Sequence, residues 1–129
     1  MKKIDRKTVY DKCAGHCAYC GCEIAIKGMH VDHVEPVFRY SVWSSEKHRY
    51  IPTGEMWRKN NDNMDNLLPS CAPCNLWKGA MGLDDFRDSV RTQIDKIKKI
   101  NGGFRLLMRF GIVTVNDPPE LFYFERMTP

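Results

Sequence analysis

The sequence predicts a single small α+β domain, and three observations lead to this prediction. The chain has 129 residues, 43% of them hydrophobic, which suits one core rather than two. Apolar residues recur at the helical period in residues 84–100, whereas residues 29–34 alternate as a strand does. Six cysteines include two Cys-x-x-Cys pairs, which indicate that a bound metal ion stabilises the fold in addition to apolar packing. We expect one domain over residues 1–129, with a core over 13–82 and an extension of helix and short strands over 83–129.

Short elements are predicted through the first two thirds of the chain, because turn-forming residues interrupt the apolar runs. Pro36 ends the first strand, since proline cannot donate to a sheet ladder, and Gly79 ends the helix after the second cysteine pair. Residues 37–63, with a turn signal at 52–54, are predicted to be irregular. The regular elements expected here are a helix at 6–12, strands at 29–34 and 67–69, and a helix at 73–78.

Residues 84–100 are predicted to form the longest helix, because an apolar stripe follows the helical period. The sequence Asn-Gly-Gly at 101–103 stops it. Residues 104–110 are compatible with a helix or a strand, and we favour the helix. Residues 112–115 and 121–124 are predicted to be strands of a closing hairpin. The apolar stripe consists of Phe86, Val90, Ile94 and Ile97.

The charge and hydropathy of the chain exclude some classes of protein. A formal net charge of +4 permits a polyanionic partner without demanding one. The sequence has no run of about 18 apolar residues, which argues against a transmembrane helix and a membrane partner. Residues 1–7 are charged and lack the apolar region of a secretory signal. We therefore expect the protein in a reducing cytoplasm, where cysteine pairs bind metal more often than they form disulfides.

The two Cys-x-x-Cys pairs predict a structural metal site. Two intervening residues let a tight turn direct both thiolates at one ion, and two such turns complete the tetrahedral sulfur cage typical of structural Zn²⁺. Such a cage has no open position, so it would hold the fold without taking part in chemistry. The predicted ligands are Cys17, Cys20, Cys71 and Cys74.

Other residues near the first pair leave the choice of ligands open. Cys13, Cys22 or His16 can replace a neighbour in the cage. We favour a plain structural role for the two cysteines, since unliganded cysteine is usually a small buried apolar residue. The alternative for both pairs is that they are unrelated buried or redox-active cysteines.

Further segments accompany the cysteine pairs in a specific order. The chain has Asp-His-Val-Glu-Pro at 32–36, Asn-Leu at 66–67 and Cys-Ala-Pro-Cys-Asn-Leu-Trp-Lys-Gly at 71–79. Together with the first cysteine pair, these segments resemble the HNH endonucleases that carry Cys-x-x-Cys pairs. The resemblance spans residues 17–79, about half of the chain. The closing segment also resembles the tails of some phage-type HNH proteins, which implies a bacterial or phage-infected host cell.

The resemblance implies a ββα-metal fold, in which two antiparallel strands and a helix surround a catalytic metal ion. By position in the motif, Asp32 and Asn75 would hold one divalent ion. His33 would act as general base, and Asn66 would fix the loop and orient the ring of His33. The implied activity is hydrolysis of phosphodiester bonds in DNA, most simply double-stranded DNA. A homodimer or a larger protein partner would then allow both strands to be cut.

The chemistry of these residue types agrees with the implied roles. Phosphodiester hydrolysis near neutral pH needs a base that removes a proton from water, and an imidazole with a pKa of about 6.5 suits that task. The carboxylate of Asp32 and the amide oxygen of Asn75 are hard ligands, which favour Mg²⁺ or Mn²⁺. Adjacent residues on a strand point to opposite faces, so Asp32 and His33 require a bend or the end of a strand.

Basic residues provide candidate contacts to nucleic acid. Lys78 lies three residues after Asn75 on the same helical face, and residues 37–63 interleave cations with aromatic rings, which suits phosphate contact and base stacking. The rings are Tyr40, Trp43, Tyr50 and Trp57. The predicted contacts are Lys78, Arg39, Arg49 and Arg58.

Each candidate also has a structural explanation. Asn66 can be a turn residue, Asn75 an exposed helical residue and Lys78 a solvated helix-end lysine. His30 lies two residues before Asp32 and therefore on the same face of the predicted strand, which makes it a further candidate ligand. We favour the explanation that it is an ordinary strand histidine. The rings of residues 37–63 can pack on the core. The alternative function is therefore a catalytically silent zinc module that binds nucleic acid or a protein, including a phage-encoded inhibitor.

Overall fold

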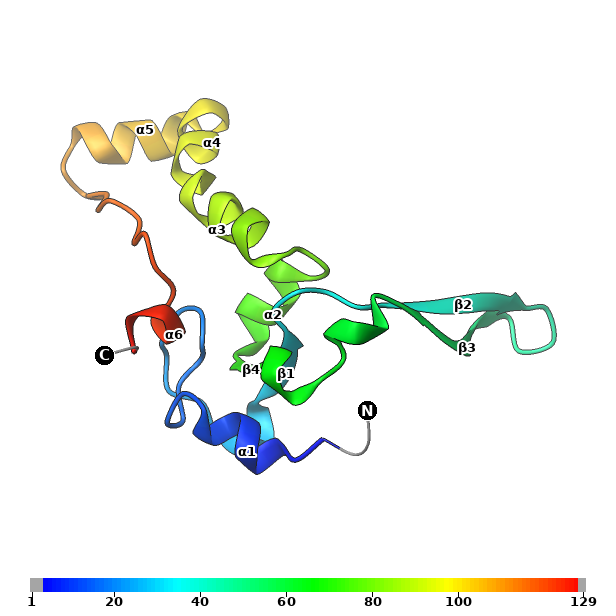
Figure 1. Ribbon diagram of the computed structural model, residues 1–129. Coiled ribbons are helices and arrows are strands. Elements are labelled where there is room, and N and C mark those ends of the chain that lie inside the picture. The colour runs from blue at the N-terminus through cyan, green and yellow to red at the C-terminus, as the bar shows by residue number, and fades with distance from the viewer. Residues whose placement is uncertain (1–3, 128–129) are drawn as a thin grey trace.

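The structure is a computed structural model in which residues 4–127 are described (Figure 1). Its central unit is a pair of strands followed directly by a helix. Strand β1 (His30–His33) pairs antiparallel with β4 (Leu67–Ser70), so that Asp32 lies opposite Leu68 and His33 opposite Leu67. Helix α2 (Ala72–Lys78) follows β4 after a single residue. The strands predicted at 29–34 and 67–69 and the helix predicted at 73–78 are thus confirmed.

The start and end of α2 follow from its sequence. Pro73 lies in the first turn, where its missing N–H costs no intrahelical hydrogen bond. Gly79 ends the helix with a φ of 51°, a backbone conformation that glycine adopts without strain. Its N–H still donates to the carbonyl of Asn75 at 3.0 Å. These two residues set the length of α2 and therefore the position of every side chain on it.

Helix α1 (Arg6–Asp11) covers one side of the strand pair and confirms the helix predicted at 6–12. The side chain of Asp5 caps it by accepting hydrogen bonds from the N–H groups of Lys7 and Thr8. Val9 faces inward and forms a fully buried cluster with Met29 and Leu67. Three 3₁₀ helices complete this region: η1 (Ile26–Gly28), η2 (Lys59–Asn61) and η3 (Met64–Asn66).

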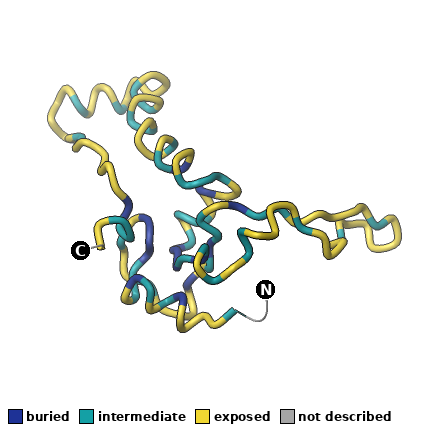
Figure 2. Tube along the Cα trace, viewed as in Figure 1, coloured by how far each residue is buried: buried dark blue, intermediate teal, exposed yellow. Residues whose placement is uncertain are grey.

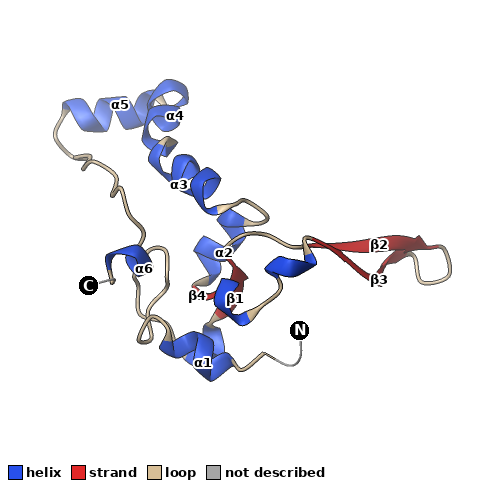
Figure 3. Cartoon of the chain, viewed as in Figure 1, coloured by secondary structure: helices blue, strands red, loops and turns tan. Residues whose placement is uncertain are grey.

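Most of residues 37–63 form a β-hairpin, which spans 38–57, so the prediction of irregular structure was wrong for that part. Strands β2 (Phe38–Ser44) and β3 (Arg49–Trp57) pair antiparallel and extend away from the central unit (Figures 1 and 3). Most of their residues are exposed (Figure 2), so there is no buried face to impose the alternation of apolar and polar residues that marks a strand. Pro52 is tolerated because each strand has one unpaired edge.

Three helices form a second extension: α3 (Leu83–Arg91), α4 (Gln93–Ile100) and α5 (Gly102–Arg109). The single helix predicted over 84–100 is interrupted at Thr92, whose hydroxyl donates to the carbonyl of Asp88 at 2.8 Å. Such a bond competes with the helical ladder. The helix favoured for 104–110 is confirmed as α5, which Asn101 caps by accepting from the N–H of Phe104.

The C-terminal segment returns to the central unit without forming the predicted hairpin. Residues 112–115 and 121–124 contain no strand, and α6 (Tyr123–Arg126) occupies the end instead. The backbone N–H groups of Tyr123 and Phe124 donate to the carbonyls of Tyr19 and Ala18, at 3.1 and 2.8 Å. The predicted strand partner is therefore replaced by the loop of the first cysteine pair. The core formed there comprises Cys17, Tyr19, Cys71, Phe86 and Phe122.

Within residues 4–127, the helices are too short and too polar for any of them to cross a membrane.

An ion pair joins the helical extension to the C-terminal segment, and its removal is expected to weaken the fold in a pH-dependent way. Arg87 on α3 contacts Glu125 through two hydrogen bonds of 2.6 and 3.1 Å, and these lower the pKa of Glu125 below its ordinary value of 4.5. The stabilisation is therefore present above pH 4.5 and lost as the pH falls through the lowered pKa. We expect Glu125→Gln to reduce the free energy of unfolding by about 1 kcal/mol at pH 7 and by much less at pH 3. Urea unfolding at the two pH values measures this.

The matched control is Glu120→Gln, which changes an exposed carboxylate five residues closer to α5. This variant should unfold like the wild type at both pH values. Equal destabilisation by Glu125→Gln at pH 3 and pH 7 would contradict an ion-pair origin.

Candidate functional site

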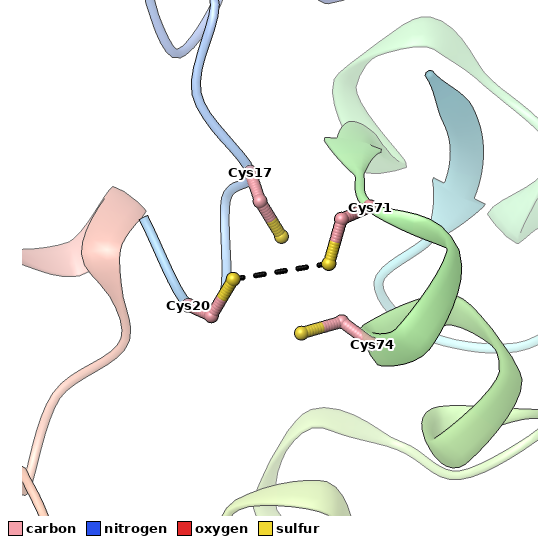
Figure 4. A group of neighbouring side chains, drawn as sticks. All are labelled: Cys17, Cys20, Cys71 and Cys74. Atoms are coloured by element: carbon pink, nitrogen blue, oxygen red, sulfur yellow. Dashed lines mark hydrogen bonds between the residues drawn. The ribbon is translucent and has the colours of Figure 1, made fainter. Parts of the chain in front are cut away.

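Four cysteine sulfurs from two distant segments lie together in the centre of the molecule (Figure 4). All four Sγ atoms lie within 4.8 Å of one another, and the sulfurs of Cys20 and Cys71 are 3.8 Å apart. A tetrahedral zinc ion with Zn–S bonds of about 2.3 Å requires sulfurs about 3.8 Å apart. The donor set and its spacing therefore fit a structural metal ion such as zinc. The four residues are those predicted from the sequence: Cys17, Cys20, Cys71 and Cys74.

Local backbone structure holds both cysteine pairs in position. In the first pair, Gly21 adopts a φ of 82° and its N–H donates to the carbonyl of Cys17 at 3.0 Å. In the second pair, Cys71 caps α2 and Cys74 lies in its first turn. The thiol of Cys74 donates to Cys17, which lowers the pKa of Cys17 to about 4 and raises the pKa of Cys74. The cluster thus favours negative charge on Cys17, which a bound cation would stabilise.

The other candidate ligands stay outside this cluster. Cys13 is buried beside α1, in agreement with a structural role, and Cys22 is exposed. A hydrogen bond to Cys20 raises the pKa of Cys22 to about 12. Nδ1 of His16 lies 3.1 Å from the carbonyl oxygen of Ala14 rather than near the sulfurs. The four predicted cysteines thus form the cluster without a ligand from Cys13, Cys22 or His16.

Asp32 is a buried carboxylate with a hydroxyl group and an ammonium group beside the same oxygen. It is 6% exposed, and its Oδ2 accepts a hydrogen bond from the hydroxyl of Tyr19 and lies 3.1 Å from Nζ of Lys78. Burial, followed by the negative charge of Asp32, raises the pKa of Tyr19, so its hydroxyl remains a donor. Sequence reasoning did not identify Tyr19, because a tyrosine between two cysteines carries no chemical signal of its own.

Lys78 has an internal position, contrary to its predicted contact with a substrate phosphate. Its side chain is fully buried, and Nζ donates to the backbone carbonyl of His33 at 2.8 Å as well as approaching Asp32. The position on the helical face of Asn75 was predicted correctly, but that face is turned toward β1. The ammonium group thus balances the charge of Asp32 inside the protein.

A small cavity of about 230 Å³ joins the end of β1 to α2. Asp32 and His33 line it from the strand, Asn75 from the helix and Arg39 from the base of the hairpin. The amide nitrogen of Asn75 lies 3.4 Å from Nδ1 of His30. His30 therefore lies next to the side chain of Asn75. Asp32 and Asn75, the two residues predicted to hold a divalent ion, line the same cavity.

The ring of His33 is held by Asp62, which the sequence did not single out. Nε2 of His33 lies 2.9 Å from Oδ1 of Asp62, and the two side chains are 14% and 10% exposed. This hydrogen bond lowers the pKa of Asp62. Asp62 lies in the polar turn at 60–63, where an aspartate is usually explained by turn formation alone. The side chains of Asp32 and His33 thus have separate partners, as expected for neighbours on a strand.

Asn66 acts on the backbone rather than on the ring of His33. Its side-chain oxygen accepts from the N–H of Glu35 at 3.0 Å, and its nitrogen donates to the carbonyls of Glu35 and Asn61 at 2.8 and 2.7 Å. Its own carbonyl accepts from Val34 at 2.9 Å. These bonds close the loop at the end of β1, as predicted. The predicted contact that orients the ring is made by Asp62 instead.

Comparisons with known proteins found no match: no family profile, curated protein or solved structure matches this chain.

The sulfur cluster predicts that metal removal unfolds the protein. Zinc binding to cysteine cages is worth about 10–16 kcal/mol in zinc-finger peptides, as much as the whole stability of a typical domain, about 5–15 kcal/mol. We expect purified protein to contain one zinc ion per chain, and we expect a strong chelator to abolish its cooperative thermal unfolding. Elemental analysis and circular dichroism measure the two quantities.

Cys17→Ser and Cys22→Ser separate ligands from neighbours. Cys17→Ser should lose zinc, whereas Cys22→Ser should retain one equivalent because Cys22 lies outside the cluster. Full zinc content in Cys17→Ser would refute the assigned ligand set.

Proposed function

We propose that this protein is a metal-dependent endonuclease of the HNH type that hydrolyses phosphodiester bonds in DNA. The observation that carries the proposal is the shared cavity, in which Asp32, His33 and Asn75 meet although α2 is about forty residues from β1. The arrangement of β1, β4 and α2 supports a ββα-metal core, and the sulfur cluster supports its structural zinc ion.

Asp32 and Asn75 are the residues that would hold the catalytic ion. Oδ2 of Asp32 is occupied by Tyr19 and Lys78, but Oδ1 accepts no hydrogen bond from residues 4–127. Buried side-chain oxygens in this part of the chain all have a partner, so Oδ1 is accessible. A carboxylate oxygen and an amide oxygen beside a polar cavity suit Mg²⁺ or Mn²⁺. When bound, such an ion stabilises the negative charge that develops on the phosphate oxygens.

His33 is the proposed general base, and its hydrogen bond to Asp62 determines which ring nitrogen accepts the proton. A carboxylate only accepts hydrogen bonds, so Nε2 of His33 carries the proton toward Asp62. In the neutral ring, Nδ1 then has a free lone pair and can accept a proton from water. The imidazolium formed in that step is stabilised by the adjacent carboxylate.

The hairpin β2–β3 is the proposed DNA-binding arm. Residues 38–59 contain five basic and two acidic residues, a net charge of +3 out of +4 for the chain. The rings of Trp43 and Tyr50 are 55% and 68% exposed, so they do not pack on the core. Arg58 stacks over Trp57 at 4.3 Å, and Arg39 lies at the cavity itself. Exposed cations and rings along an arm whose base reaches the cavity suit a polyanion with flat bases.

A non-enzymatic zinc module is the second candidate, because the ion pair between Asp32 and Lys78 also satisfies Asp32 without a divalent ion. In that case the hairpin would bind nucleic acid or a protein without cleavage. The two candidates differ in whether substitution of His33 has any effect beyond stability.

Plasmid cleavage tests the proposed activity. We expect zinc-loaded protein with Mg²⁺ or Mn²⁺ to convert supercoiled DNA to nicked or linear forms. His33→Ala should slow cleavage at least about 100-fold, the usual contribution of a general base. Asp95→Asn on the exposed face of α4 is the control and should cleave like the wild type.

All variants are compared after their zinc content and thermal unfolding have been matched. If the wild type leaves the plasmid intact with every divalent metal tested, the enzyme proposal fails and the binding-module alternative stands.

The hairpin predicts a specific change in DNA affinity. Arg49 is exposed on β3, so Arg49→Ala should weaken binding to a labelled duplex and reduce the slope of log affinity against log salt concentration by about 1. Fluorescence anisotropy of the zinc-loaded protein without added Mg²⁺ or Mn²⁺, which prevents cleavage and leaves the structural zinc ion in place, measures this. Lys96→Ala removes the same charge from α4 and should leave the slope unchanged. The same slope for wild type and Arg49→Ala would contradict the assignment of the hairpin.

A further inference from the structure

We propose that Tyr19 and Lys78 together position Asp32 for metal binding, and thereby link the structural sulfur cage to the catalytic ion. We call these two residues the Asp32 clamp. The inference rests on the proposed function, since it concerns the same carboxylate. Its basis is that each cysteine pair brings one group to the same oxygen, Oδ2 of Asp32: the Tyr19 hydroxyl as a hydrogen-bond donor and the Lys78 ammonium group as an ion-pair partner.

Tyr19 belongs to the first cysteine pair, between Cys17 and Cys20. It is 3% exposed, and its ring packs edge-on against Phe86 and Phe122, with centroids 5.1 and 5.3 Å away. The cage holds its backbone and the two rings hold its side chain. The direction of the hydroxyl is therefore determined by the cage and by the core around it.

Lys78 belongs to the second cysteine pair, since it lies four residues after Cys74 on α2 and shares a face of that helix with it. Its ammonium group contacts Asp32 and also donates to the carbonyl of His33 at 2.8 Å. One buried cation thus contacts both residues of the Asp32–His33 pair. A shift of α2 would move both of them relative to the cavity.

The clamp divides the two oxygens of Asp32 between two tasks. Oδ2 is held by the clamp inside the protein, whereas Oδ1 is accessible at the cavity. With Oδ2 held, the carboxylate cannot rotate freely, so Oδ1 is presented in one direction. Residues that orient a ligand in this way typically contribute about 10–100-fold to metal affinity or activity.

A purely structural ion pair makes a different prediction. If Tyr19 and Lys78 only compensated the buried charge of Asp32, loss of the Tyr19 hydroxyl would lower stability and leave the affinity for a divalent ion unchanged. Metal affinity in a folded, zinc-loaded variant therefore distinguishes positioning from compensation.

The experiment measures Mn²⁺ binding to the full, zinc-loaded chain by electron paramagnetic resonance, with no DNA present. Tyr19→Phe removes only the hydroxyl, and Tyr123→Phe makes the same change on α6 beside the first cysteine pair. We expect the dissociation constant for Mn²⁺ to rise about 10–100-fold in Tyr19→Phe and to stay unchanged in Tyr123→Phe, with one zinc ion in each protein. Asp32→Asn identifies the signal that belongs to this site.

Two further readouts complete the test. The Mg²⁺ concentration for half-maximal cleavage should rise in Tyr19→Phe, while the maximal rate at saturating Mg²⁺ changes much less. Lys78→Arg keeps the positive charge beside Asp32 but replaces the compact ammonium group with a larger guanidinium group. It should displace Oδ2 and weaken Mn²⁺ binding in the same sense, which provides a second test where Tyr19→Phe does not retain zinc.

The outcomes separate the two proposals. If the wild type binds Mn²⁺ at Asp32 and folded Tyr19→Phe and Lys78→Arg bind it equally well, the clamp is refuted and the proposed function stands. If the wild type neither binds Mn²⁺ nor cleaves DNA, the proposed function fails and the clamp fails with it.

Discussion

Four cysteine sulfurs bring together two segments that lie about fifty residues apart, and the remaining structure is arranged around this contact. The first segment provides the loop on which the C-terminal residues Tyr123 and Phe124 rest. The second provides the start of α2, which sets the positions of Asn75 and Lys78. Few side chains are fully buried elsewhere, so apolar packing alone offers little to replace the contact. A small chain with two long extensions can therefore keep one well-ordered centre.

The buried ion pair between Asp32 and Lys78 shows how such a centre can hold charge. Removing two charges from water is costly, and the cost is offset here by additional hydrogen bonds from Tyr19 to Asp32 and from Lys78 to the carbonyl of His33. Both charges lie at the junction of β1 and α2. The polar network and the sulfur cage are thus adjacent parts of one interior, and Tyr19 belongs to both.

Sequence reasoning predicted the central elements because each carries a local signal. Cys-x-x-Cys spacing identified the four sulfurs, and Gly79 marked the end of α2. The hairpin escaped prediction because it has no buried face. The short break at Thr92 is accompanied by hydroxyl hydrogen bonds to the carbonyls of Asp88 and Ser89, which the apolar stripe does not reveal. Asp62 and Lys78 acquire their contacts only when distant segments meet, Asp62 with His33 and Lys78 with Asp32. Such contacts leave no pattern in the local sequence.

The hairpin is inserted between the two strands of the central pair, and it closes on itself at its base. Phe38 pairs with Trp57 where the arm leaves the body, with ring centroids 5.0 Å apart. Asp32 and His33 come before this closure, and Asn66 and Asn75 come after it. The turn end of the arm lies beyond this closure, so its length and sequence can change without displacing Asp32, His33 or Asn75, whereas Arg39 at its base lines the cavity. The turn end of the arm is therefore the part of this chain where an inserted residue or an exchanged side chain disturbs the central unit least.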